Sequence, residues 1–163
     1  MNLKKIHQEA IPRALELAER YRLLNEPDQA VSICRDILET DAAHQSALKT
    51  LLLALSDGFG QAGGPGYQEA DAICDRLKSE YDRAYYRGVV YERWARSKLK
   101  QSAPAYLAGE WVRRAMALYE EAERSMPSGD DSAVLRWNAC ARLVAKVPQL
   151  LAESDAHELH LGD

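Results

Sequence analysis

Three segments of the chain share one pattern of apolar positions. Each begins with a small residue, followed after three residues by an aliphatic side chain, after four by Cys or Tyr, and after seven by an apolar residue. These offsets fall on one face of an α-helix, so each segment is predicted to be an amphipathic helix. The segments are residues 30–37, 70–77 and 115–122. Their regular recurrence indicates one supersecondary unit that has been copied along the chain.

The rest of the chain is also predicted to be almost entirely helical. β-branched residues are scarce, while Ala, Leu, Glu and Arg dominate. Asn25-Glu26-Pro27 should stop the first helix, and Pro27 suits the first turn of the second. Residues 58–66 contain five glycines and one proline, which predicts a loop. The expected helices are 3–24, 27–40, 43–56, 67–79, 82–100, 104–125 and 130–146, followed by a short turn from Pro148.

Small and large residues recur at matching places in these helices. The small residues expected at helix crossings are Ala14, Ala18, Ala30, Ala70, Ala84, Gly88, Ala115 and Ala122. The larger residues expected in the grooves beside them are Leu17, Tyr21, Cys34, Ile37, Leu48, Leu51, Leu52, Leu55, Cys74, Leu77, Tyr91 and Tyr119. Pro127 closes the third unit. Small residues at a crossing let two helices approach to about 8 Å, and large ones fill the neighbouring grooves.

This arrangement resembles the tetratricopeptide repeat (TPR), a helix–turn–helix unit of 34 residues. The resemblance covers residues 11–146, and Gly88 and Pro127 are its most specific matches. It implies an all-α, right-handed helical-repeat array of about three helix pairs plus a C-terminal capping helix. That domain would span residues 1–152, and residues 153–163 would be a flexible tail. The chain departs from the family at Ala42, where Pro is usual, at the Gly-rich insertion, and at extra residues around 99–106.

The resemblance also implies a binding groove lined by the first helix of each unit. Some TPR proteins hold a partner's terminal carboxylates with Lys, Asn and Arg, but here those places hold Leu15, Glu19, Thr50, Asp82 and Tyr86. That carboxylate clamp is therefore absent. The expected lining mixes apolar and charged residues, which suits a protein segment with apolar anchors. The candidate groove residues are Leu15, Glu19, Arg22, Lys49, Leu53, Tyr85, Val89, Glu92 and Arg93.

A basic segment gives a second candidate site. The net charge of the chain is −4, but residues 83–114 carry eight Lys or Arg and two Glu. A solvated helix face is the default interpretation, and a docking surface for an acidic partner is the next. RNA binding is the alternative function, for which Tyr85, Tyr86, Tyr106 and Trp111 could supply stacking. The candidate basic surface consists of Arg83, Arg87, Arg96, Lys100, Arg113 and Arg114.

Other features indicate no catalytic chemistry. The Gly58–Gly66 stretch lacks the Gly-Lys-Ser/Thr ending of a phosphate-binding loop and follows a helix, so a flexible interhelix loop is expected. His157, Glu158 and His160 lack the spacing of a strong metal site, so a solvated tail is expected there. No Ser/His/Asp set has a recognisable local context. We therefore predict a non-enzymatic scaffold that binds a protein or peptide and needs no metal or cofactor.

Cysteine use and hydropathy bear on location. Three cysteines are an odd number, and Cys34 and Cys74 occupy the inward position of the repeat. Reduced thiols packed in a core are typical of a reducing compartment, so a cytoplasmic protein is expected. The sequence contains no apparent secretory signal and no apolar run approaching 18 residues. Partner identity and oligomeric state stay open at this level.

Overall fold

The computed structural model describes residues 2–151, which form helices and no β-strand. The α-helices are α1 Ile11–Leu23, α2 Pro27–Thr40, α3 Gln45–Asp57, α4 Tyr67–Cys74, α5 Glu80–Lys100, α6 Ala105–Glu123 and α7 Ser132–Lys146. The all-α prediction is confirmed. Two 3₁₀-helices, η1 Gln8–Ala10 and η2 Pro148–Leu151, lie outside the expected count of three pairs and a cap. The proposed tail, residues 153–163, lies outside the described residues.

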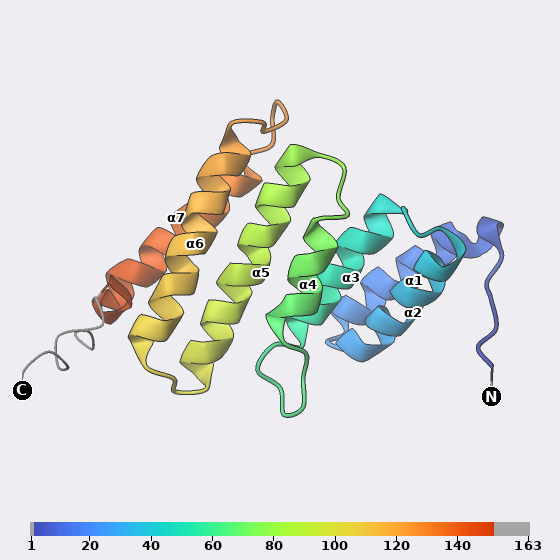
Figure 1. Ribbon diagram of the computed structural model, residues 1–163, viewed down its shortest axis with the longest axis horizontal. Coiled ribbons are helices and arrows are strands. Elements are labelled where there is room, and N and C mark those ends of the chain that lie inside the picture. The colour runs from blue at the N-terminus through green and yellow to red at the C-terminus, as the bar shows by residue number, and fades with distance from the viewer. Residues whose placement is uncertain (1, 152–163) are drawn as a thin grey trace, which may run out of the picture.

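The helices follow one another along the length of the molecule (Figure 1). Each α-helix packs against the next one in the chain, and a second set of contacts joins α1 to α3, α3 to α5, and α5 to α7. The four odd-numbered helices are therefore neighbours in one layer. The even-numbered helices α2, α4 and α6 each pack against the two odd-numbered helices on either side of them.

The first α-helix begins at Ile11, eight residues later than predicted. Pro12 lies in its first turn, where the missing N–H costs no hydrogen bond. The preceding residues make few buried contacts, and Leu3 is 91% exposed. Because short helices depend on tertiary packing, nothing stabilises a helix over residues 3–7.

The fourth α-helix ends at Cys74 rather than at residue 79. After Cys74 the backbone leaves the helix and bonds to distant side chains. The Gln45 side chain accepts from the Lys78 N–H at 2.9 Å, and Arg83 donates to the carbonyl oxygens of Leu77 and Lys78 at 2.8 Å. Gln45 belongs to α3 and Arg83 to α5. The local sequence around α4 therefore carries no sign of the bonds that form after Cys74. Every other α-helix boundary differs from its prediction by at most two residues.

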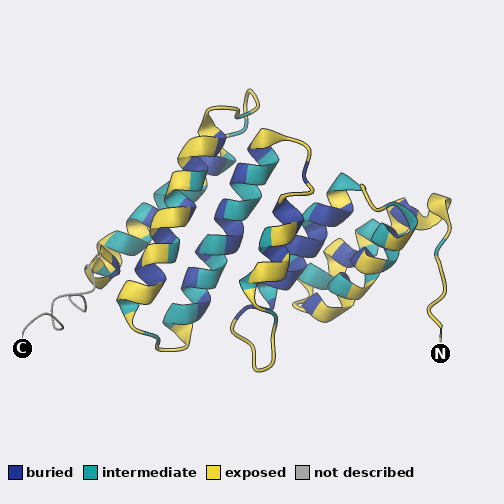
Figure 2. Ribbon diagram, viewed as in Figure 1, coloured by how far each residue is buried: buried dark blue, intermediate teal, exposed yellow. Residues whose placement is uncertain are grey.

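The repeated apolar pattern points into the core (Figure 2). Ala30, Ala70 and Ala115 are all fully buried, as are the side chains four residues later, Cys34, Cys74 and Tyr119. One large core cluster joins α1–α4 with the near side of α5. A second cluster joins the other side of α5 with α6, α7 and η2. The helix α5 is therefore shared by both.

The Gly-rich segment is a loop, as predicted, and its first residues pack against α5 and the residue that follows it. Phe59 is buried and packs edge-on against Trp94, with ring centroids 5.3 Å apart. Gly60 and Gly63 have positive φ angles of 83° and 70°, which favour glycine. Within residues 2–151 we find no helix of the length and apolar character needed to cross a membrane.

Candidate functional site

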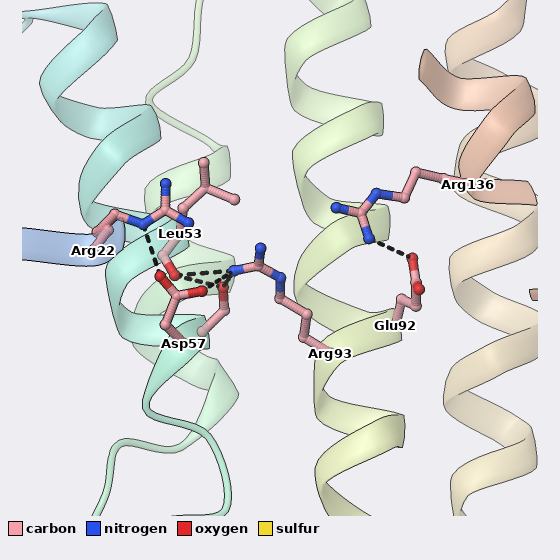
Figure 3. A network of polar contacts seen from close by, with 7 residues as sticks. Arg22, Leu53, Asp57, Glu92, Arg93 and Arg136 are labelled. Atoms are coloured by element: carbon pink, nitrogen blue, oxygen red, sulfur yellow. Dashed lines mark hydrogen bonds and ion pairs between the residues drawn. The ribbon is translucent and has the colours of Figure 1, made fainter. Parts of the chain in front are cut away.

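The candidate site is a layer of side chains on the odd-numbered helices, here called the odd-helix face. We define it by Arg22 of α1, Lys49, Leu53 and Asp57 of α3, Asp82, Tyr85, Tyr86, Arg93 and Arg96 of α5, and Arg136 of α7. On α3 the residues at 49, 53 and 57 are four apart, so they form one stripe along the helix. Figure 3 shows the central part of this face.

Asp57 joins three helices at the centre of the face. Its two carboxylate oxygens accept from Arg22 Nε at 2.7 Å and from Arg93 Nη1 at 2.6 Å. Arg93 Nη1 also donates to Ser56 Oγ at 2.6 Å and to the Leu53 carbonyl oxygen at 3.1 Å. The Ser56 hydroxyl in turn donates to the same Leu53 carbonyl oxygen at 2.8 Å. Arg93 thus positions the end of α3 as well as presenting charge.

Glu92 forms a second polar centre beneath the face. Its side chain is only 1% exposed. The hydroxyl of Tyr119 donates to it at 2.8 Å, Arg96 Nε at 2.9 Å, and Arg136 Nη1 at 3.5 Å. A buried carboxylate is costly unless it is paired and hydrogen-bonded, and these three donors meet that requirement. The bonds from Tyr119 and Arg136 also fix α6 and α7 against α5.

A third ion pair and a group of tyrosines complete the face. Lys49 Nζ lies 2.6 Å from Asp82 and 5.6 Å from the centre of the Tyr86 ring. Tyr85 stacks on Tyr81 with ring centroids 5.5 Å apart, and its ring also lies beside Tyr86. Both Tyr85 and Tyr86 are half-buried. They therefore offer apolar surface beside charged groups.

The charges of this face affect one another. Burial lowers the pKa of Arg93 from its ordinary value; Asp57 opposes that shift, whereas the positive charges of Arg22 and Arg136 add to it. Burial, aided by Asp82, raises the pKa of Tyr86 to about 12. Tyr86 therefore stays neutral at physiological pH.

The predicted groove residues do not all reach the surface. Val89 and Glu92 are buried, so their side chains are not available to a partner. Leu15 is half-buried and packs against the cluster of Ile11, Ile37 and Ala47, while Glu19 is exposed. The half-buried residues Arg22, Lys49, Leu53, Tyr85 and Arg93 are the ones that contribute to the odd-helix face.

Two members of the face, Asp57 and Arg136, were missed by the sequence analysis. Asp57 lies four residues after Leu53, so the helical periodicity of α3 could have found it. Arg136 lies on α7, which was treated as a cap, and no signal in the sequence relates it to Glu92. Its place on the face depends on how α7 packs against α5.

The predicted basic surface is not a continuous free surface. Arg87 pairs with Asp71 at 2.8 Å and with Asp75 at 2.6 Å, and Arg114 pairs with Glu110 at 2.5 Å. Arg113 donates to the Leu150 carbonyl oxygen at 3.1 Å. Arg83 bonds to the segment after α4 and Arg96 to Glu92, as described above, whereas Lys100 is exposed. Arg83, Arg87 and Arg113 therefore hold neighbouring elements together, whereas Arg96 and Arg114 pair within their own helices.

Other candidate sites are weaker. A hollow of about 580 Å³ lies beside α2 and α4, away from the odd-helix face, and an ion pair between Arg35 and Glu69 at 3.0 Å joins the two helices there. In the described part of the chain, no group of three His, Cys, Asp or Glu side chains is placed to hold a metal ion. The proposed His157–His160 segment lies outside the described residues.

Comparisons of the chain with protein-family models, with curated proteins and with solved structures gave no match. Its function is therefore inferred from the geometry of its own side chains.

Proposed function

We propose that the chain is a TPR-like helical-repeat scaffold, without enzymatic activity, that binds a segment of another protein along the odd-helix face. The right-handed superhelix expected from the resemblance to TPR proteins would make this face concave. A cytoplasmic location fits the three free, buried cysteines.

One observation carries the proposal: side chains from four odd-numbered helices meet on one continuous face. Asp57 links α1, α3 and α5, and Glu92 links α5 and α7. Ion pairs that fix the helices also hold Leu53 and Tyr85 in place between them. A preorganised face of this kind loses little conformational entropy when a partner binds.

The RNA-binding alternative has less support. Single-stranded nucleic acid binds to free cations beside exposed aromatic rings. Here Arg83, Arg87 and Arg96 are engaged in bonds within the chain, and acidic side chains lie between them. We therefore prefer a protein partner.

Hydrogen–deuterium exchange on a captured complex tests the proposal. The full chain would be used to capture a partner from native cell extract, and exchange would be compared with and without it. Added protection is expected in α3 and α5 around Leu53 and Tyr85. Protection confined to α2, α4 and α6 would move the site to the opposite side, and protection by RNA alone would favour the alternative.

A further inference from the structure

Positive charge exceeds negative charge at the centre of the odd-helix face. Four arginines, Arg22, Arg93, Arg96 and Arg136, surround two carboxylates, those of Asp57 and Glu92. Asp82 does not offset the excess, because it is paired with Lys49. Glu19 is exposed and lies three residues before Arg22 on α1, so it reduces the excess beside Arg22. The excess is therefore concentrated where α5 faces α7.

Three of these arginines lie in a row across the face (Figure 3). We call Arg22, Arg93 and Arg136 the arginine row. The Arg136 side chain is 36% exposed and reaches Glu92 only at 3.5 Å, a longer contact than those made by Arg22 and Arg93 with Asp57. A guanidinium group has five N–H donors. Each arginine can therefore donate to its carboxylate partner within the chain and still donate to a further anion.

We propose that the arginine row binds the acidic side chains of the partner segment, with Arg93 and Arg136 as the central pair. This inference rests on the proposed function and names its class of partner: a protein segment in which Asp or Glu residues lie beside apolar ones. Guanidinium groups match a carboxylate with two parallel hydrogen bonds. Leu53 and Tyr85, next to the row, provide the apolar contacts.

The surroundings of the row favour carboxylates over a nucleic-acid backbone. The arginines alternate with Asp57 and Glu92, which would repel a continuous line of phosphates. The whole chain is also acidic, with a net charge of −4, and long-range attraction of a polyanion needs the opposite sign. Isolated carboxylates on a protein segment can reach single arginines and avoid the acidic neighbours. Partial burial strengthens each such contact, because solvent screening is reduced.

Selection from a library of random linear peptides, displayed against the full chain, tests this inference. We expect the enriched peptides to contain Asp or Glu next to apolar residues. Synthetic copies with Gln or Asn in place of the acidic residues should bind roughly tenfold more weakly. Binding of the acidic peptide should also weaken in high salt.

Variants of the chain assign the effect to the row. Arg136→Gln and Arg22→Gln should each lower the affinity of the chain for the selected acidic peptide by roughly tenfold. The matched control is Arg13→Gln. Arg13 also belongs to α1, but its exposed side chain pairs with Glu16 at 2.8 Å and lies outside the row. The Arg13→Gln variant should bind the acidic peptide as tightly as the wild type does. Circular dichroism and thermal melting verify that each variant is folded. Arg93→Lys keeps the charge and loses the planar fork, so an intermediate loss is expected.

The outcomes separate this inference from the proposed function. Enrichment of neutral apolar peptides that depend on Tyr85 and not on the row would reject the acidic partner and keep the binding face. Failure to enrich any peptide would reject both. If acidic peptides bind the Arg136→Gln and Arg22→Gln variants as tightly as the wild type, the arginine row is not their binding site. Displacement by single-stranded RNA that depends on Arg136 would replace the inference with nucleic-acid binding.

Discussion

At the scale of single residues, small and polar side chains on α5 do the most to define the structure. Gly88 has no Cβ, and a Cβ placed there would lie 2.6 Å from Cε1 of the Tyr119 ring. The ring therefore fills the space that Gly88 leaves free, and its hydroxyl reaches Glu92. Burial, with the negative charge of Glu92, raises the pKa of Tyr119 well above its ordinary value, so it remains a hydrogen-bond donor. One small residue thus permits a buried polar network.

Gly88→Ala should destabilise the protein because the added methyl group displaces the Tyr119 ring. Overpacking of this kind costs about 1–3 kcal/mol of unfolding free energy. Denaturant melts of the wild type, Gly88→Ala, Tyr119→Leu and the double variant would measure the coupling. Gly88→Ala should cost less in the Tyr119→Leu background, where the ring is gone. Equal costs in both backgrounds would contradict the contact.

The buried thiols should react slowly with alkylating reagents in the native protein. Burial raises the pKa of Cys34 and of Cys74 to about 12, so the reactive thiolate is rare at neutral pH. Labelling followed by mass spectrometry should show slow modification of both residues in buffer. In denaturant, where burial is lost, labelling should be fast. Fast labelling of both in the native state would show that the repeat alignment is wrong.

At the scale of helices, the repeated alanines act as contact points where helices come close together. Ala70 lies on α4, which has only eight residues and therefore few contacts with which to hold its place. Its side chain is fully buried, whereas Ala72 on the same helix is exposed. This difference within one short helix gives a direct test of the repeat register.

Ala70→Leu should lower the free energy of unfolding by roughly 1–3 kcal/mol, because the larger side chain would push α4 away from its neighbours. Ala72→Leu makes the same chemical change at an exposed position and is expected to alter stability by less than about 0.5 kcal/mol. Thermal or denaturant unfolding of the two variants measures the contrast. Similar melting of Ala70→Leu and the wild type would place Ala70 at the surface.

The sequence predicted the helices better than it predicted their contacts. Apolar residues with helical spacing located the seven α-helices found within residues 2–151, because that period follows from backbone geometry alone. The end of α4 was missed because Lys78 and Leu77, which follow the helix, bond to Gln45 and Arg83 of other helices. The pairing of Arg136 with Glu92 was missed for a similar reason. A charged residue in a sequence carries no sign of which distant residue it will meet.

At the scale of the whole molecule, α5 connects the two core clusters and carries the centre of the candidate site. Its residues Glu92 and Arg93 are adjacent, yet Glu92 turns toward α6 and α7 while Arg93 turns toward α1 and α3. The face is therefore held from both sides by ion pairs that cross between helices. A partner bound at Tyr85 would contact α5, the helix at which the two core clusters meet.

Tyr85→Ala should weaken partner binding more than Arg83→Ala or Lys100→Ala, with helical content preserved. Apolar anchors at the centre of an interface commonly cost more than about 2 kcal/mol when truncated, while exposed rim charges cost less. Tyr85 is half-buried beside Leu53 and the arginine row, whereas Lys100 is exposed at the end of α5. Dissociation constants for the captured partner would be measured for each variant, with circular dichroism as the check on folding. The reverse order, in which Arg83→Ala and Lys100→Ala each weaken binding more than Tyr85→Ala, would reject the odd-helix face and move the site to the basic segment 83–114.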